Sequence, residues 1–144
     1  MSGSFTGDFK KLGLLQASMA RLAKVPSQLA GDVTEKIADE IRAEFAAGQD
    51  PYGRAWAALS EATLTRGRFA PPLTDTGDTI DSLEVKPMAG AGVSISFGTE
   101  YAGFHQTGTK NMPARQPLPT AGFPSSWSKI LSEAAEKKVA EALR

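Results

Sequence analysis

Apolar residues recur at three- and four-residue spacing in three stretches of the chain, a pattern typical of amphipathic helices. The first stretch predicts a helix over residues 8–24, and Pro26, well tolerated in a first helical turn, opens a second helix over residues 26–47. The third predicts a C-terminal helix over residues 125–143. In the middle helix the apolar residues stand four apart, so their stripe winds around the helix and favours more than one packing neighbour.

Residues 82–98 show an alternating pattern instead. Val93, Ile95 and Phe97 alternate with serines, and a tetrapeptide with alternating glycines precedes them, which predicts a β-hairpin. Together these elements predict an α+β fold in which three main α-helices pack on a small, hairpin-centred antiparallel sheet, as a single domain over residues 1–144. So small a sheet has an open edge, where we expect another subunit.

Two of the predicted connections differ in composition. Gly48 ends the long helix, and after a proline turn Trp56 predicts a short helix that reaches about Ala62. Trp56 itself is expected to anchor the core. Residues 64–73 are polar, basic and proline-bearing, which predicts a loop or a protruding hairpin.

The longest irregular segment covers residues 99–122. Tyr101 to His105 are expected to form one or two helical turns that Gly108 ends, and three prolines within seven positions prevent a long helix or a central strand after them. Exposed connections on a rigid scaffold often carry a protein's contacts, so we expect functional residues in this long loop.

The composition of the chain excludes several classes of protein. Sixteen basic and sixteen acidic residues cancel, which excludes the strongly basic composition of a protein that grips nucleic acid along its length. The absence of cysteine excludes disulfides, thiolate metal sites and a cysteine nucleophile. No apolar run approaches the ~20 residues of a membrane helix, and no signal peptide is visible, so we expect a soluble protein made in a cytoplasm.

Several short motifs resemble enzymatic sites but lack the context that the chemistry needs. Residues 103–110 nearly match a phosphate-binding loop, but Lys110 comes one residue late and Pro113 stands where the phosphate-binding helix would begin. Asp75-Thr76-Gly77 spells the aspartic-protease triplet, but it follows a proline-rich loop instead of a buried strand. We expect a turn at this position.

Other titratable residues also lack partners at a useful spacing. Asp75, Asp78 and Asp81 do not have the alternating spacing of a calcium loop and are expected to be solvated. His105, the single histidine, is expected to pack or to form a hydrogen bond because no partner for general base catalysis stands at a fixed spacing from it. We therefore expect no catalytic residue, no metal and no cofactor.

Four blocks of the sequence, taken together, resemble the Mu-like phage virion morphogenesis family, also called phage tail completion proteins. The blocks appear in the family's order and, with Phe45 before them, span about Phe45 to Leu118. They read Asp50-Pro51-x-Gly53-x-x-Trp56-x-x-Leu59, Pro72-Leu73-x-x-Thr76-Gly77, Tyr101-Ala102-x-x-His105-Gln106-x-Gly108 and Met112-Pro113-Ala114-Arg115-x-Pro117.

This resemblance implies a structural protein, not an enzyme, at the head-tail junction of a tailed phage or phage-like particle. It implies a ring of copies, commonly a hexamer, between head-completion or adaptor proteins and tail-tube or tail-terminator proteins. Packaged DNA would pass through the ring, and no membrane would take part. The protein would be assembled in the bacterial host cytoplasm and reside in the virion. A tail terminator ring, a nucleic-acid-binding module and a small hydrolase remain as alternatives.

We interpret the motif residues as fold and interface positions. On this hypothesis, one group fixes the turn after the long helix, and a second orders the long loop and contacts the next subunit. The first group is Asp50, Pro51, Gly53 and Trp56, and the second is Tyr101, His105, Gly108, Met112, Pro113 and Arg115. Arg115→Glu is then expected to weaken assembly while the monomer stays folded. The basic residues Arg66, Arg68 and Lys110 are expected to face the channel or a partner, where several copies would attract phosphate.

Overall fold

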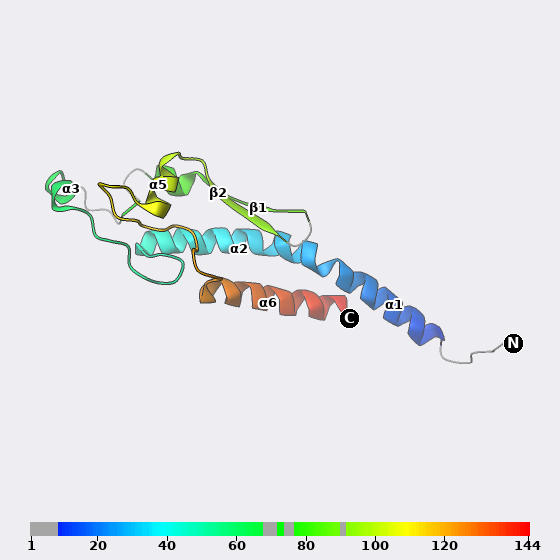
Figure 1. Cartoon of the computed structure of the whole chain (residues 1–144). Coiled ribbons are helices and arrows are strands. Elements are labelled where there is room, and N and C mark those ends of the chain that lie inside the picture. The colour runs from blue at the N-terminus through cyan, green and yellow to red at the C-terminus, as the bar shows by residue number, and fades with distance from the viewer. Residues whose placement is uncertain (1–8, 68–71, 74–76, 90–91) are drawn as a thin grey trace.

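The computed structural model of the protein describes residues 9–67, 72–73, 77–89 and 92–144. Over these residues the fold class is the predicted α+β, with several helices and one antiparallel pair of strands (Figure 1). The helices are α1 (Phe9–Ala23), α2 (Val25–Ala47), α3 (Glu61–Thr65), α4 (Asp78–Asp81), α5 (Tyr101–Thr107) and α6 (Ser125–Ala142), and the strands are β1 (Leu83–Pro87) and β2 (Val93–Phe97).

Helix α2 lies in the middle of the body, with the β1–β2 hairpin on one side and α6 on the other (Figure 1). Its winding apolar stripe explains this position, because successive residues of the stripe reach different neighbours. Ile41 and Phe45 are 0% and 1% exposed, and α6 contributes Trp127 to the same core. The body therefore consists of hairpin, helix and helix, stacked in that order.

The hairpin register places its apolar side chains on one face. Leu83 pairs with Phe97 and Val85 with Ile95, and all four pack against the core. Glu84 and Lys86 alternate with them and are exposed. A slip of one residue would turn the apolar side chains to solvent, so burial against α2 determines this register.

Aromatic rings fill the end of the core where α2 stops. Phe45 contacts Trp56 edge-on, with ring centroids 5.1 Å apart, and contacts Phe97 at 5.8 Å. Trp56 is buried, as a core anchor should be. Gly48 ends α2 with a φ of 67°, a left-handed conformation that glycine adopts without steric cost. The chain can therefore turn sharply and bring Trp56 back beneath the helix end.

The short helix predicted from Trp56 to Ala62 is wrong. Residues 56–60 lie outside any helix, and α3 begins only at Glu61, where the Ser60 hydroxyl accepts a hydrogen bond from the Thr63 N–H at 3.3 Å. The reason lies far away in the sequence. Two carbonyl groups of this segment accept hydrogen bonds from the Arg115 side chain, and in a helix they would be occupied within the helix.

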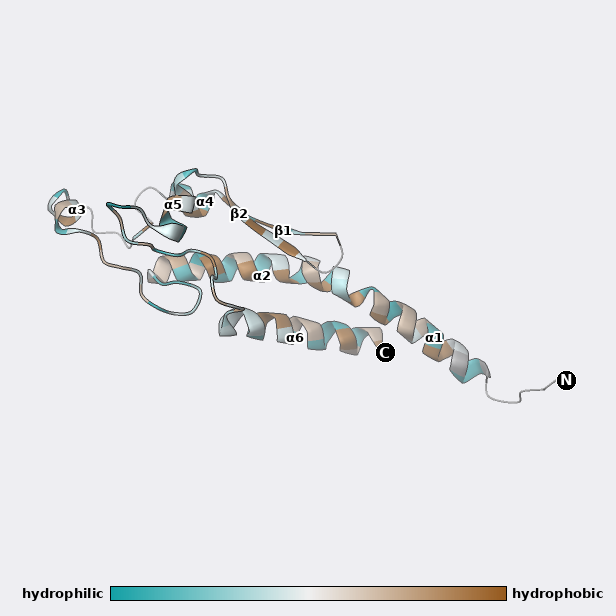
Figure 2. Cartoon of the chain, viewed as in Figure 1, coloured by the Kyte–Doolittle hydropathy of each residue, from teal (hydrophilic) through white to brown (hydrophobic). Residues whose placement is uncertain are grey.

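Helix α1 extends beyond the end of α2 and away from the body (Figure 1). The Arg21 side chain fastens its C-terminal end to α6, because Nε donates a 2.7 Å hydrogen bond to the Ala142 carbonyl. Leu14, Leu15 and Met19 remain 62%, 56% and 60% exposed. Of the three main helices, then, α2 packs on the sheet directly and α6 packs through α2, whereas α1 carries apolar residues outside the body (Figure 2).

Candidate functional site

Five side chains hold helix α5 and two irregular segments together, and we call this group the loop latch. It consists of Asp50, Tyr52, Trp56, Gln106 and Arg115. The irregular segments are residues 48–60 and 113–122, which have few regular backbone hydrogen bonds of their own. Four of its members, all except Tyr52, belong to the sequence blocks that carry the family resemblance.

Asp50 organises the turn that follows α2. Its Oδ1 accepts hydrogen bonds from the backbone N–H groups of Tyr52 and Arg54, each at 2.9 Å, and its Oδ2 accepts from Arg54 Nε at 2.8 Å. An aspartate that bonds to N–H groups just after it closes a local turn. Pro51 is buried in this turn, and Gly53 has a φ of 84°. The carboxylate is 6% exposed and fully engaged, so it is a structural group.

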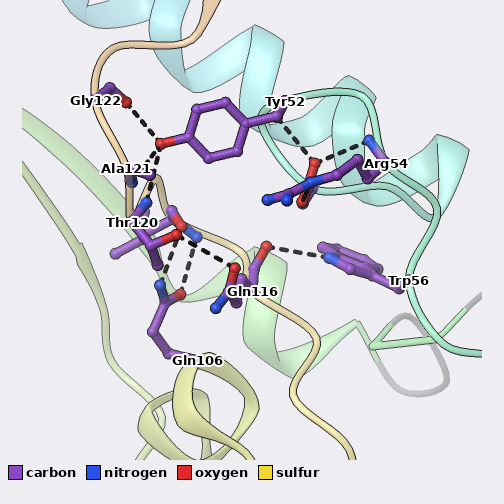
Figure 3. Close-up of polar contacts among 10 residues, drawn as sticks. Tyr52, Arg54, Trp56, Gln106, Gln116, Thr120, Ala121 and Gly122 are labelled. Carbon is purple, nitrogen blue, oxygen red and sulfur yellow. Dashed lines mark hydrogen bonds and ion pairs between the residues drawn. The ribbon is translucent and has the colours of Figure 1, made fainter.

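The Tyr52 hydroxyl connects this turn to the segment before α6 (Figure 3). It donates a 2.6 Å hydrogen bond to the Gly122 carbonyl and accepts from the N–H groups of Ala121 and Thr120 at 2.7 and 3.1 Å. One side chain thus satisfies three backbone groups that no helix or strand occupies.

Trp56 and Gln106 bond the same segment closer to its middle (Figure 3). Trp56 Nε1 donates to the Gln116 carbonyl at 3.1 Å. The Gln106 amide, on α5, donates to the Leu118 carbonyl and accepts from the Leu118 N–H, both at 3.0 Å. This paired contact imitates a β-ladder where Pro117 and Pro119 prevent a regular one.

Arg115 is the buried positive charge of the latch. It is 8% exposed, and its Nε and Nη2 donate 2.7 Å hydrogen bonds to the carbonyls of Ala57 and Ala58. Burial lowers the pKa of its guanidinium from the ordinary value. The Arg115 N–H also donates to the His105 carbonyl at 2.8 Å. We therefore abandon the expectation that Arg115→Glu leaves the monomer folded, because the new carboxylate would face two carbonyl oxygens.

His105 packs on α5 as the sequence suggested. Its ring meets Tyr101 edge-on at 6.1 Å, and burial, together with the nearby charge of Arg115, lowers the pKa of the imidazole. Its Nδ1 is buried without a hydrogen-bond partner among the described residues. Across the part of the chain that the structure describes, no three histidine, aspartate or glutamate side chains gather closely enough to hold a metal ion.

Gly108 and the turn after it shape the tip of the long loop. Gly108 has a φ of 75°, and a Cβ on it would lie 2.9 Å from the Ala114 nitrogen, so a larger residue cannot fit without movement of the backbone. Thr109 and half-buried Met112 then pair across a tight turn, with Lys110 exposed at its tip and Pro113 exposed after it. The turn and α3 lie at the end of the molecule opposite α1 (Figure 1).

The remaining candidates are exposed or lie outside the described residues. Arg66 is exposed at the end of α3, and Asp78 and Asp81 are exposed on the single turn of α4. Arg68, Asp75 and Thr76 are outside the described residues. No described helix is both long enough and apolar enough to cross a membrane.

A comparison with protein-family models matches residues 8–144 to the phage virion morphogenesis family. The chain belongs to this family. Membership gives it a structural role in building a phage particle and associates it with the virion. Comparisons with curated proteins and with solved structures found no match.

In this phage virion morphogenesis protein, sequence reasoning missed one buried polar pair. Glu44 is 3% exposed, and its Oε1 accepts a 3.0 Å hydrogen bond from Trp127 Nε1. Its Oε2 has no hydrogen-bond partner among the described residues. Burial, opposed in part by this bond, raises the pKa of Glu44 to about 7. The signal was present in the sequence, since Glu44 follows Ile37 and Ile41 at helical spacing on an apolar face.

Proposed function

We propose that this protein forms a ring of identical copies at the head-tail junction of its particle, as a tail completion or neck protein. Head-completion or adaptor proteins would bind one side of the ring, and tail-tube or tail-terminator proteins the other. The ring would leave a passage for the packaged DNA.

The observation that carries this proposal is the contrast between a closed body and an uncovered helix. The latch residues form their hydrogen bonds inside the chain, whereas Leu14, Leu15 and Met19 on α1 are all more than half exposed. Large exposed apolar groups that gather on one element mark association surfaces. Soluble assemblies of identical chains are usually closed and symmetric, and a particle with an axis of symmetry favours a ring.

The two-stranded sheet supports the same proposal. Among the described residues β1 pairs only with β2, so each strand has one side without a backbone partner. Open strand edges pair readily with another chain. The hairpin therefore offers a second surface for a neighbouring subunit or for a tail or head protein.

The end of the molecule opposite α1 carries exposed basic residues on separate loops, of which Arg66 and Lys110 are described. A single copy has no net charge. Repeated around a ring, however, such residues would line a basic rim, and several phosphate contacts together give measurable attraction for DNA. We propose that this end faces the channel or a partner.

Particles made without this chain test the proposal. We expect filled heads and free tails of normal length in electron micrographs, and we expect the purified protein to join them. Joined particles in its absence would contradict a role at the junction. Tails of irregular length would instead indicate a terminator ring that caps the tail tube.

A further inference from the structure

Helix α1 presents a narrow apolar stripe to solvent. Leu15, Met19 and Leu22 follow one another at four- and three-residue spacing, so their side chains lie on one face. Leu15 and Met19 are more than half exposed, and Leu22 is half-buried near the junction with the body. Anchors with this spacing are the ones that a helix inserts into an apolar groove of another protein.

The body of the same chain contains an apolar groove. It lies between the hairpin, α2 and α6, has a volume of about 200 Å³, and is lined by Val33, Ile37, Val93, Ile95, Phe123, Trp127 and Leu131. Phe123 is 59% exposed at its rim and contacts Trp127 edge-on. A dry apolar cavity of ~150 Å³ already accepts a benzene-sized group. The groove therefore has room for a large apolar side chain such as Leu or Met.

Helix α1 and the remainder of the chain carry opposite net charges. Helix α1 carries Lys10, Lys11 and Arg21 and no acidic residue. Because the whole chain is neutral, the remainder carries a net negative charge. This difference favours contact between α1 and the body of another copy over contact between two α1 helices.

Helix α1 of one chain does not occupy the groove of its own body. Hydrogen bonds from Arg21 to the Ala142 and Arg144 carbonyls hold the base of α1 at the end of α6. From that point α1 extends away from the hairpin and α2 (Figure 1). Only another copy, or another protein, can bring a helix to the groove.

We propose that α1 of each copy packs its Leu15–Met19 face on the groove of the next copy and inserts Met19 into it. This inference rests on the proposed ring and specifies its contact. Each copy then contributes a helix on one side and a groove on the other. Such a head-to-tail contact closes into a ring when the rotation per subunit divides a full turn.

Disulfide cross-linking tests the contact in assembled particles, since the natural chain contains no cysteine. Particles are completed with a chain that carries both Met19→Cys and Leu131→Cys. On a non-reducing gel we expect a ladder of linked copies up to the subunit number of the ring. A mixture of the two single variants should give linked dimers, which excludes a bond within one chain.

The matched control moves the cysteine to the opposite face of α1. Ala17→Cys with Leu131→Cys should give no ladder, because residue 17 is exposed and points away from the Leu15–Met19 side. Joined particles without a ladder from the Met19→Cys and Leu131→Cys chain would overturn the inference and leave the ring itself standing. If particles join normally without any copy of the chain, the proposed function fails instead.

Discussion

The loop latch and α1 differ in whether their side chains find partners within the chain. In the latch, irregular segments with few backbone bonds are fixed by side chains such as Asp50, Tyr52 and Arg115, whose polar atoms find partners within the chain. In α1 the backbone is regular, but the apolar side chains of Leu14, Leu15 and Met19 are more than half exposed. The first region forms its contacts within a single copy, whereas we propose that the second forms its contacts with another copy.

The residues that identify the family therefore differ from the residues that we propose to contact another copy. Several motif residues that carry the family resemblance, among them Trp56 and Arg115, are buried and hold the fold. The exposed apolar residues of α1 lie before those motifs in the sequence. On our proposal, the motifs that identify the family therefore do not mark the contact between copies.

The largest expected effect breaks the latch. Arg115→Glu leaves the Ala57 and Ala58 carbonyls unpaired and buries a carboxylate beside them, so it should destabilise the monomer by about 4 kcal/mol or more. Urea unfolding followed by circular dichroism measures the change. Exposed Arg66→Glu is the control and should shift the stability by less than about 0.5 kcal/mol. Equal stability of the two variants would refute the structural role of Arg115.

Unfolding measured over a range of pH tests the buried carboxyl group of Glu44. The pKa of Glu44 is raised from 4.5 to about 7, so the folded protein binds a proton that the unfolded chain releases between these values. Stability from this group is present below about pH 4.5 and is lost as the pH rises to about 7, by roughly 3 kcal/mol.

Glu44→Gln keeps an oxygen for the Trp127 N–H and removes the titration. Urea unfolding should then give a variant that is more stable than the natural protein at pH 8, with a flatter profile from pH 5 to 8. Exposed Glu133→Gln should retain the natural profile. An unchanged slope in Glu44→Gln would show that this carboxyl ionises normally. Helix α1 has no acidic residue, so this pH dependence reports on the stability of the body and not on α1.

A smaller change sharpens the role of the latch. Tyr52→Phe removes the hydroxyl that bonds Gly122, Ala121 and Thr120, and we expect a loss of about 1–2 kcal/mol, since water can reach these exposed backbone groups. Hydrogen exchange should accelerate at residues 120–122 in particular. Tyr101→Phe is the matched control, for which less than about 0.5 kcal/mol is expected. Similar losses for both tyrosines would argue against the latch.

The smallest effect on folding is expected in α1. Met19→Ser should change the free energy of unfolding by less than about 0.5 kcal/mol, because the side chain is already 60% exposed. Sedimentation should nevertheless show weaker assembly than for Ala17→Ser on the other face. A marked loss of monomer stability would mean that α1 folds onto its own body in solution.

The sequence by itself determined the three main helices, the hairpin and the family. The spacing of apolar residues and the positions of proline and glycine are local signals. Pro26 and Gly48 therefore indicate where a helix begins and ends, and the alternation of Val93, Ile95 and Phe97 indicates which face of the strand is buried. The apolar stripe of α2 also predicted more than one packing neighbour, and in the structure the hairpin and α6 pack on its two sides.

Only the tertiary structure decided what covers each apolar face and what satisfies each irregular segment. The stripes of α1 and α2 look alike in the sequence, yet one is exposed and the other is buried. Likewise, the bonds from Arg115 to Ala57 and Ala58 join residues 58 and 57 positions apart, and they prevent a helix that local spacing predicted. Periodicity records that a face is apolar, but the partner that buries it depends on how distant segments meet in space.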